Sequence, residues 1–179
     1  PARAAGAEAS PPTEIRYGLS MGGDRGIHVQ VDGYLDSDII ARILKAVVER
    51  EAPDLVLMGK QAVDDDNNQA AQLLAEYLGW GQACFASRVD FRSDSLVRVE
   101  REVDGGIEVV EMDLPGIISA DLRLNEPRYP ALPAIMKAKK KDMQVIDPAA
   151  LGVDMTPKVI IKKMADPPKR QGGRMVADV

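Results

Sequence analysis

The sequence contains one cysteine, Cys84, among its 179 residues, so a disulfide within the chain is excluded and a reducing compartment is favoured. Cys84 stands between apolar neighbours with no histidine or second cysteine nearby, which predicts a small buried side chain rather than a nucleophile. The one histidine, His28, has no carboxylate or thiol at ligand spacing. We therefore expect His28 to be structural rather than catalytic.

Long hydrophobic runs and aromatic residues are also scarce. No apolar run approaches the ~20 residues of a membrane-spanning helix, so we expect a chain that does not itself span a membrane. Aromatic residues make up 4% of the sequence, and the core must therefore consist of aliphatic side chains, alanine and methionine. The formal net charge of −5 argues against a dedicated nucleic-acid-binding protein, which normally carries a basic excess to contact phosphates.

Sequence motifs for nucleotide hydrolysis and covalent catalysis are missing. Gly59-Lys60 lacks the upstream glycine and the following Ser or Thr of a Walker loop, and no Gly-x-Gly-x-x-Gly or Gly-x-Ser-x-Gly motif occurs. Asp64, Asp65 and Asp66 are adjacent, without an organised set of further metal ligands. These absences give little support to an enzyme and predict no metal site.

The N-terminal part of the chain predicts a lead-in followed by helices and strands in turn. Residues 1–12 are rich in Ala, Gly, Ser and Pro, which predicts a flexible segment. A helix is expected over residues 14–21, and alternating apolar residues predict a strand over 27–31. Apolar residues at helical spacing then predict a helix that Ser37 or Asp38 caps.

Residues 54–59 form a near-continuous apolar segment, typical of a strand that is buried on both faces of a sheet. Together with the strand at 27–31 and the helix between them, this segment predicts a βαβ unit with a right-handed crossover. The next helix is expected to end at Gly79.

The second half of the chain predicts mostly strands. They are expected over residues 84–91, 96–103, 107–112, 115–120, 143–146 and 158–164, with a short helix over 132–141. Asp104-Gly105-Gly106 predicts a hairpin turn. These patterns divide the chain into the lead-in at 1–12, an α/β nucleotide-binding domain at 13–150 and a C-terminal arm at 151–179.

The loop that follows Gly59 is a candidate nucleotide site, because ligands of open α/β sheets bind where strands end and helices begin. Unpaired backbone amides near Asn68, Gln69 and Ala70 can hold a phosphate, and Asp65 can accept hydrogen bonds from ribose hydroxyls. The alternative is a solvated acidic cap that complements the helix dipole. The residues themselves leave both interpretations open.

The segment at 132–141 combines apolar and basic residues. Leu132, Ile135 and Met136 share one helical face, and a lysine face with Lys137, Lys140 and Lys141 lies beside it. An apolar anchor beside a basic cluster suits a transient protein-docking site. The alternatives are a core-facing helix with a solvated lysine face and, third, nucleic-acid binding.

Segments spread along the chain resemble the beta subunits of electron-transfer flavoproteins. These segments are VEREVDGGIEV at 99–109, PGIIS at 115–119, LRLNEPRY at 122–129, LPAIMKAKKK at 132–141, GKQAVDDD at 59–66 and MGGDRGIH at 21–28. The resemblance implies a Rossmann-like adenine-nucleotide-binding fold with a mostly parallel sheet, a β-hairpin insertion and an extended C-terminal arm. It also implies that residues 151–179 contact an alpha subunit.

In that family the flavin accepts electrons from acyl-CoA and related dehydrogenases of fatty acid β-oxidation and passes them to a membrane quinone oxidoreductase. The resemblance implies a heterodimer in which FAD is carried mainly by the alpha subunit and one structural AMP by the beta subunit. This chain would be a carrier subunit without catalytic residues. The mitochondrial matrix is the expected compartment, with a bacterial cytoplasm as the alternative.

The resemblance also assigns roles to residues. It implies AMP contacts at Asp65, Asn68, Gln69 and Ala70, where the family usually has Thr at the position of Ala70. It places Leu132, with Ile135 and Met136 beside it, on the loop that docks dehydrogenases. It further places Lys137 and Lys140 on lysines that are methylated in some members, a change that retains charge but alters hydrogen bonding.

The sequence departs from the family at its ends. The N-terminal region that holds the first strands of the sheet and one wall of the AMP site is missing, and the C-terminus stops short of the expected last helix. Two alternatives therefore remain beside the carrier subunit. One is a degenerate scaffold subunit of a larger assembly, and the other is an adenine-nucleotide hydrolase.

Overall fold

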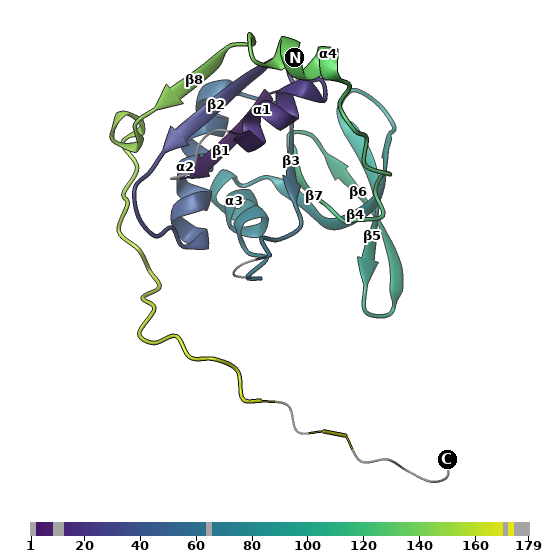
Figure 1. Cartoon of the computed structure of the whole chain (residues 1–179). Helices are drawn as coiled ribbons and strands as arrows, with labels where there is room; N and C mark the ends of the chain where they lie inside the picture. Colours follow the sequence, from purple (N-terminus) through teal and green to yellow (C-terminus); the bar gives the residue numbers. More distant parts are fainter. Residues whose placement is uncertain (1–2, 9–12, 64–65, 170–171, 174–179) are drawn as a thin grey trace, which may run out of the picture.

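The computed structural model describes residues 3–8, 13–63, 66–169 and 172–173. In this part of the chain, the strands form a three-stranded sheet of order β1-β2-β8 and a five-stranded sheet of order β3-β7-β4-β5-β6 (Figure 1). The strands are β1 Arg3–Glu8, β2 Arg25–Gln30, β3 Leu55–Gly59, β4 Gly81–Phe91, β5 Leu96–Val103, β6 Gly106–Asp113, β7 Gly116–Ala120 and β8 Met143–Ile146. The helices are α1 Thr13–Ser20, α2 Ser37–Glu51, α3 Ala70–Leu78, α4 Leu132–Ala138 and the 3-10 helix η1 Pro148–Leu151. The predicted α/β class is confirmed.

Strand β1 lies in the segment whose composition predicts a flexible lead-in. It pairs in parallel with β2, from Arg3 opposite Arg25 to Glu8 opposite Gln30. A ladder of this kind is made by backbone groups, so a stretch of small residues with no apolar alternation can still join a sheet. Residues 1–2 and 9–12 lie outside the described part.

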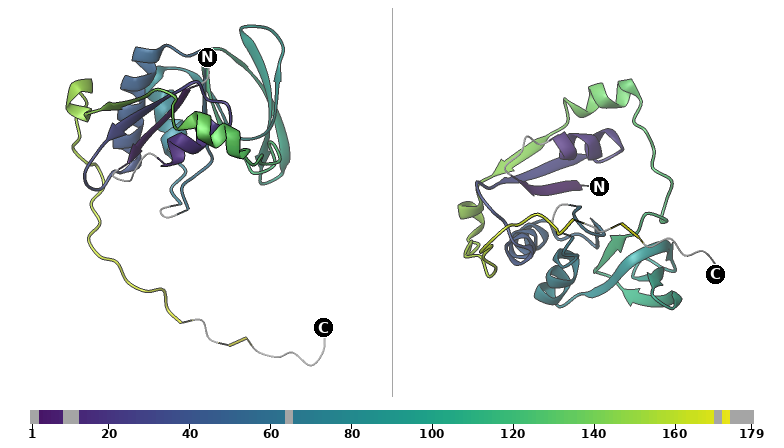
Figure 2. Two further views of the ribbon diagram at one scale, coloured as in Figure 1. Left: turned by 45° about the horizontal axis from the view of Figure 1, so that its top comes forward. Right: turned by 60° about the horizontal axis from the view of Figure 1, so that its bottom comes forward.

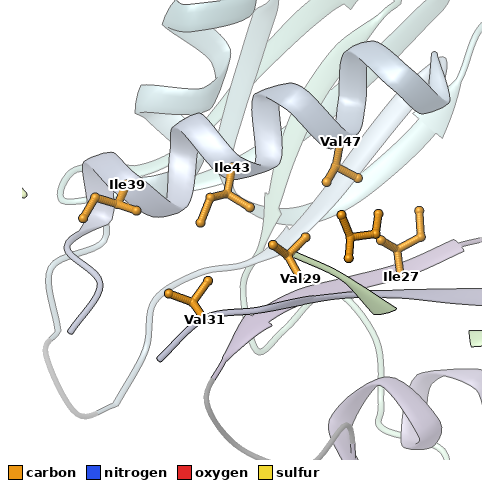
Figure 3. Packing of buried hydrophobic residues seen from close by; sticks show 7 residues of the cluster. Ile27, Val29, Val31, Ile39, Ile43 and Val47 are labelled. Carbon is orange, nitrogen blue, oxygen red and sulfur yellow. The ribbon is translucent and has the colours of Figure 1, made fainter. Parts of the chain in front are cut away.

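Helix α2 packs against β2 with one apolar face. Figure 3 shows Ile39, Ile43 and Val47 pointing toward the side on which Ile27, Val29 and Val31 lie, and all six side chains are buried. Complete burial of an aliphatic side chain of this size contributes about 1.5–3 kcal/mol. The helix therefore holds the three-stranded sheet by hydrophobic contact from Ile39 to Val47.

A second face of α2 packs against the five-stranded sheet. Ala41 and Val48 share a buried cluster with Leu74 of α3 and Ile117 of β7. Because α2 follows β2 and precedes β3, it connects strands of two different sheets. The predicted βαβ unit within one sheet is therefore wrong for the described residues, although the strand–helix–strand order is right.

Strand β3 is at the edge of the five-stranded sheet, where it pairs in parallel with β7. Helices α2 and α3 cover one face, but Leu57 on the other face is 62% exposed. The prediction of a strand buried on both faces is therefore wrong in this structure. An apolar run indicates that a strand tends to be buried, but it does not indicate which segment buries it.

The antiparallel part of the five-stranded sheet confirms the hairpin insertion. Strands β5 and β6 pair antiparallel around Asp104 and Gly105, and Gly106 has a φ of 134°, a conformation that favours glycine. Val97 and Val99 of β5 are fully buried against β4 and β7 residues in a third apolar cluster.

Helices α1 and α4 lie on the opposite side of the three-stranded sheet from α2 (Figure 2). Ile15, Leu19 and Ala138 form a small buried cluster, and Arg16 donates to the carbonyl oxygens of Ala138 at 2.8 Å and Lys141 at 2.7 Å. Lys141 in turn donates from Nζ to the carbonyl oxygens of Leu19 at 3.0 Å and Gly23 at 2.5 Å. The C-terminal end of α4 is therefore fastened to α1.

The chain after η1 is extended and runs away from the two sheets (Figure 1). The predicted strand at 158–164 is not formed. The beginning of this arm is nevertheless anchored to α2, because Asp36 Oδ2 accepts the backbone amides of Lys158 at 2.7 Å and Val159 at 3.0 Å. Arg42 adds a bond from Nη2 to the carbonyl oxygen of Thr156 at 2.8 Å.

Asp36 also caps α2, since its Oδ1 accepts the amide of Ile39 at 2.8 Å. The cap is thus Asp36, not Ser37 or Asp38 as predicted. Burial raises the pKa of the Asp36 carboxyl, but the three backbone amides of Ile39, Lys158 and Val159 outweigh burial, and the pKa lies below the ordinary value of 3.8. One buried carboxylate thus begins a helix and holds the arm.

Replacement of Asp36 by alanine should destabilise the protein only where the carboxyl is ionised. Its pKa is lowered in the folded state, so its contribution is complete above the unfolded pKa and declines as the pH falls through the folded pKa. At pH 7 we expect Asp36→Ala to lower the free energy of unfolding by about 1–2 kcal/mol. Urea unfolding of both proteins at pH 7 and near pH 3 measures the difference, which should shrink in acid. Asp94→Ala, in an exposed turn, is the control, and an equal loss at both pH values would contradict the assignment.

Candidate functional site

Strands β3 and β7 run in parallel and end at the same edge of the sheet. Their register pairs Gly59 with Ala120, so the next residues, Lys60 and Asp121, lie together beyond the strand ends. Lys60 Nζ is 3.2 Å from Asp121 Oδ2. This edge is where an open α/β sheet presents its ligand-binding loops.

The loop from Lys60 to α3 carries the predicted nucleotide contacts. Asp66 and Asn68 adopt left-handed backbone conformations, with φ of 54° and 48°, which Asp and Asn tolerate better than most residues. Gln61 Nε2 donates to Asp66 Oδ1, and the Asp66 amide donates to the carbonyl oxygen of Ala62 at 3.1 Å. Asp65 lies outside the described residues.

Asn68, Gln69 and Ala70 are brought together at the beginning of α3. Gln69 is the N-cap residue and forms no side-chain cap, so the amides of the first helical turn remain directed out of the helix. Gln72 Nε2 donates to Asn68 Oδ1 at 3.3 Å, while Gln72 Oε1 is buried and has no hydrogen-bond partner among the described residues. A buried oxygen of this kind in the first turn of a helix, where backbone amides point out of the helix, fits a bound group with hydrogen-bond donors and a phosphate.

A β-bulge in β4 borders the same edge. The pairing of β4 with β7 shifts between Ala83 and Ala86, and Phe85 has a left-handed φ of 64°. The Phe85 amide donates to the fully buried Ser119 Oγ at 3.0 Å, and Arg101 Nε donates to the Cys84 carbonyl oxygen at 3.1 Å. Two side chains thus satisfy the backbone groups that the bulge removes from the ladder.

The bulge directs the Phe85 ring to Lys60, whose Nζ lies 5.2 Å from the ring centroid. Burial raises the pKa of the Asp121 carboxyl, but the Arg123 amide and the Lys60 ammonium together hold that pKa below its ordinary value. The Asp121 carboxyl is therefore ionised at neutral pH. Cys84 is buried, and burial raises the pKa of its thiol, which agrees with the predicted inert side chain.

The predicted docking residues lie on α4. Leu132, Ile135 and Met136 are 72%, 38% and 52% exposed, so this structure does not place them in a core. Lys137 and Lys140 are also exposed. Lys141 differs from the predicted lysine face, because it binds carbonyl oxygens of Leu19 and Gly23.

Sequence patterns miss several features of this edge and of the docking surface. Leu122 and Tyr129 are 91% and 92% exposed in the segment between β7 and α4, which has no periodic pattern to mark them. The Lys60–Asp121 pair joins residues that are far apart in sequence, and no local motif predicts it.

Two kinds of site are absent from the described residues. No cluster of three or more His, Cys, Asp or Glu side chains there is arranged to hold a metal ion. Within those same residues, no helix has the length and apolar character needed to cross a bilayer.

Comparison with known proteins assigns the family. Residues 4–151 match the family described as "Electron transfer flavoprotein domain". The chain is 52% identical over 163 residues to the human "Electron transfer flavoprotein subunit beta", which covers 89% of this chain and 64% of that protein. It is 49% identical over 165 residues to the Bradyrhizobium diazoefficiens protein of the same name, and 48% over 166 residues to the Arabidopsis thaliana protein named "Electron transfer flavoprotein subunit beta, mitochondrial". Each of these two matches covers 92% of this chain and 66% of the relative.

The chain belongs to the electron transfer flavoprotein beta-subunit family. This confirms the family that the sequence motifs resemble. The chain spans 64% to 66% of the length of these relatives.

Replacement of Ser119 by alanine should destabilise the bulge. Ser119 is fully buried and its hydroxyl is the acceptor for the Phe85 amide, which would be left without this bond. A buried donor without a partner costs about 1–3 kcal/mol, so denaturant unfolding should give a free energy lower by that amount. Ser95→Ala, in an exposed turn of the same sheet, is the control and should change stability by less than about 0.5 kcal/mol. Equal effects of the two substitutions would show that the hydroxyl does not support the bulge.

Proposed function

We propose that this chain is the beta subunit of a heterodimeric electron-transfer flavoprotein, with no bond-making chemistry of its own. Family membership over most of the chain carries this proposal. When FAD is bound, mainly on the alpha subunit, it supplies the redox chemistry. The role of this chain is then to hold a structural nucleotide and to present a surface to electron donors.

The proposed nucleotide is AMP, held at the beginning of α3. Asn68, Gln69 and Ala70 contribute amides and polar side chains, and Asp65 contributes a carboxylate to the ribose. The support is the first turn of α3, which has no side-chain cap at Gln69, and the buried Gln72 Oε1 in the same turn, which has no hydrogen-bond partner among the described residues. Ala70 contributes only its backbone.

The proposed docking surface consists of Leu132, Ile135 and Met136, with Lys137 and Lys140 on the adjacent face. Its support is the exposure of three large apolar side chains on a short helix whose opposite end is fastened to α1. The partners are acyl-CoA and related dehydrogenases, which give electrons to the flavin, and a membrane quinone oxidoreductase, which receives them. Methylation of Lys137 or Lys140 would weaken charge-assisted contacts there without removing the charge.

Residues 151–179 are proposed to contact the alpha subunit. In the described part of this arm, Val159, Ile160, Ile161 and Met164 are at least 50% exposed, which is a large apolar content for a solvated segment. The proposed compartment is the mitochondrial matrix, which the name of the Arabidopsis relative supports, and the alternative is a bacterial cytoplasm, which the Bradyrhizobium relative supports.

Native mass spectrometry of the complex purified from its source, followed by denaturation, tests the carrier role. One larger partner with one FAD and one AMP is the expected result. A partner without either nucleotide would favour a scaffold subunit over the carrier subunit. A lone chain that turns over ATP would favour the adenine-nucleotide hydrolase.

The nucleotide assignment predicts that Asp65→Ala combined with Asn68→Ala lowers the AMP content of the purified complex. The two substitutions remove a ribose acceptor and a polar contact, so we expect about a tenfold or greater loss of affinity for AMP. Quantitative mass spectrometry of released nucleotide gives the occupancy. Asp94→Ala with Asn125→Ala, at exposed positions elsewhere, is the matched control. Unchanged AMP occupancy in the Asp65/Asn68 variant would defeat the assignment.

The docking assignment predicts that Leu132→Ala slows electron transfer from dehydrogenases about tenfold or more, as loss of an interface anchor does. FAD content and thermal stability should not change, because the side chain is 72% exposed. Stopped-flow reduction of the flavin by dehydrogenase measures the rate. Ile107→Ala removes an apolar side chain that is 60% exposed on the hairpin and should leave the rate unaltered. A fall in flavin content with Leu132→Ala would instead assign the residue to structure.

A further inference from the structure

Lys60 connects the nucleotide-binding loop to the sheet. The bonds of Gln61, Asp66 and Asn68 described above join neighbours in the loop and α3, whereas the Lys60 ammonium reaches Asp121 beyond the end of β7 at 3.2 Å. Lys60 is the first residue of the loop, and its side chain is 36% exposed, while that of Asp121 is 9% exposed. The pair therefore ties the start of the loop to a nearly buried carboxylate.

Asp121 is itself fixed from two sides. Its amide donates to the carbonyl oxygen of Ala86 at 2.9 Å, and its Oδ1 accepts the amide of Arg123 at 3.2 Å. The free Oδ2 is thereby aimed at Lys60. A carboxylate held by backbone bonds loses little further conformational entropy when it binds an ammonium.

Phe85 is the second contact of the Lys60 ammonium. A phenylalanine with a φ of 64° is unusual, and the bulge that imposes this conformation is maintained by Ser119 and Arg101. The result is an aromatic ring 5.2 Å from the Lys60 ammonium, presented from β4 rather than from the loop itself. Strained conformations of this kind are kept where they position another group.

We propose that Asp121 and Phe85 are positioning residues that act through Lys60 to fix the loop start, so that Asn68, Gln69 and Ala70 meet the nucleotide. This inference rests on the proposed AMP site. It assigns no contact with the nucleotide to Asp121 or Phe85. Their effect on nucleotide affinity is therefore indirect and depends on the presence of Lys60.

A double-mutant cycle on the whole complex tests the inference. AMP affinity is measured by isothermal titration after removal of bound nucleotide, for wild type, Lys60→Met, Asp121→Asn and the double variant. We expect Asp121→Asn to weaken AMP binding about tenfold and the double variant to bind no more weakly than Lys60→Met. Phe85→Leu should show the same dependence on Lys60, and Asp121→Glu should recover much of the affinity. Asp90→Asn, which removes the 3.1 Å pair with Arg88 on the same sheet, is the matched control and should bind AMP normally.

The outcomes separate this inference from the site on which it rests. Additive effects of Lys60→Met and Asp121→Asn would overturn it, because general loss of structure adds whereas action through a shared residue does not. Normal AMP affinity of Asp121→Asn, with weak binding by Asn68→Ala, would also overturn it and leave the nucleotide site in place. Normal AMP affinity of Asn68→Ala and of every Lys60 and Asp121 variant would overturn both this inference and the proposed AMP site. If a variant melts at a lower temperature, titration below its transition still reports the affinity of the folded protein.

Discussion

The packing of α2 against two sheets is the constraint on which the other parts depend. Ile39, Ile43 and Val47 bury one face of the helix on β2, and Ala41 and Val48 bury another beside α3 and β7. Since interiors are close-packed, a helix with two such faces allows little relative movement of the sheets. Its N-cap residue, Asp36, anchors the arm, and its C-terminal end leads into β3. The orientation of α2 therefore fixes where the nucleotide loop and the arm begin.

The carboxyl edge of the five-stranded sheet combines regular and irregular structure. Parallel pairing of β3 and β7 places Lys60 beside Asp121, a result of register that follows from ladder geometry. The bulge at Phe85 adds what a regular ladder cannot, since in a regular strand successive side chains alternate between faces. The cost of the left-handed residue is offset by bonds from Ser119 and Arg101, which lie on two neighbouring strands. The parallel pair β3 and β7 thus positions the start of the loop, and the bulge in β4 places the Phe85 ring against Lys60.

Sequence patterns predict the helices and strands of this fold better than they predict which elements pack against one another. Helices α1, α2 and α3, the hairpin β5–β6 and the end of α3 at Gly79, with its φ of 65°, follow from local periodicity and turn chemistry. Strand β1 could not be predicted, because backbone pairing with β2 forms it without an apolar pattern. The exposure of Leu57 depends on which segments cover β3, and that information is not local. The Lys60–Asp121 pair likewise depends on tertiary register. Strand–helix order marked this loop as a candidate site, and the family resemblance decided between the two interpretations that the residues left open.

The two ends of α4 differ in a way that bears on docking. At its C-terminal end, Arg16 and Lys141 connect α4 to α1 through carbonyl oxygens, and Ala138 is buried. At its N-terminal end, Leu132 is mostly exposed and no side-chain cap fastens the helix. A flexible apolar residue would lose entropy on binding, whereas one on a fastened helix is already held near its bound position. This asymmetry favours a surface that contacts successive partners with the same anchor, because each encounter needs little reorganisation of the chain.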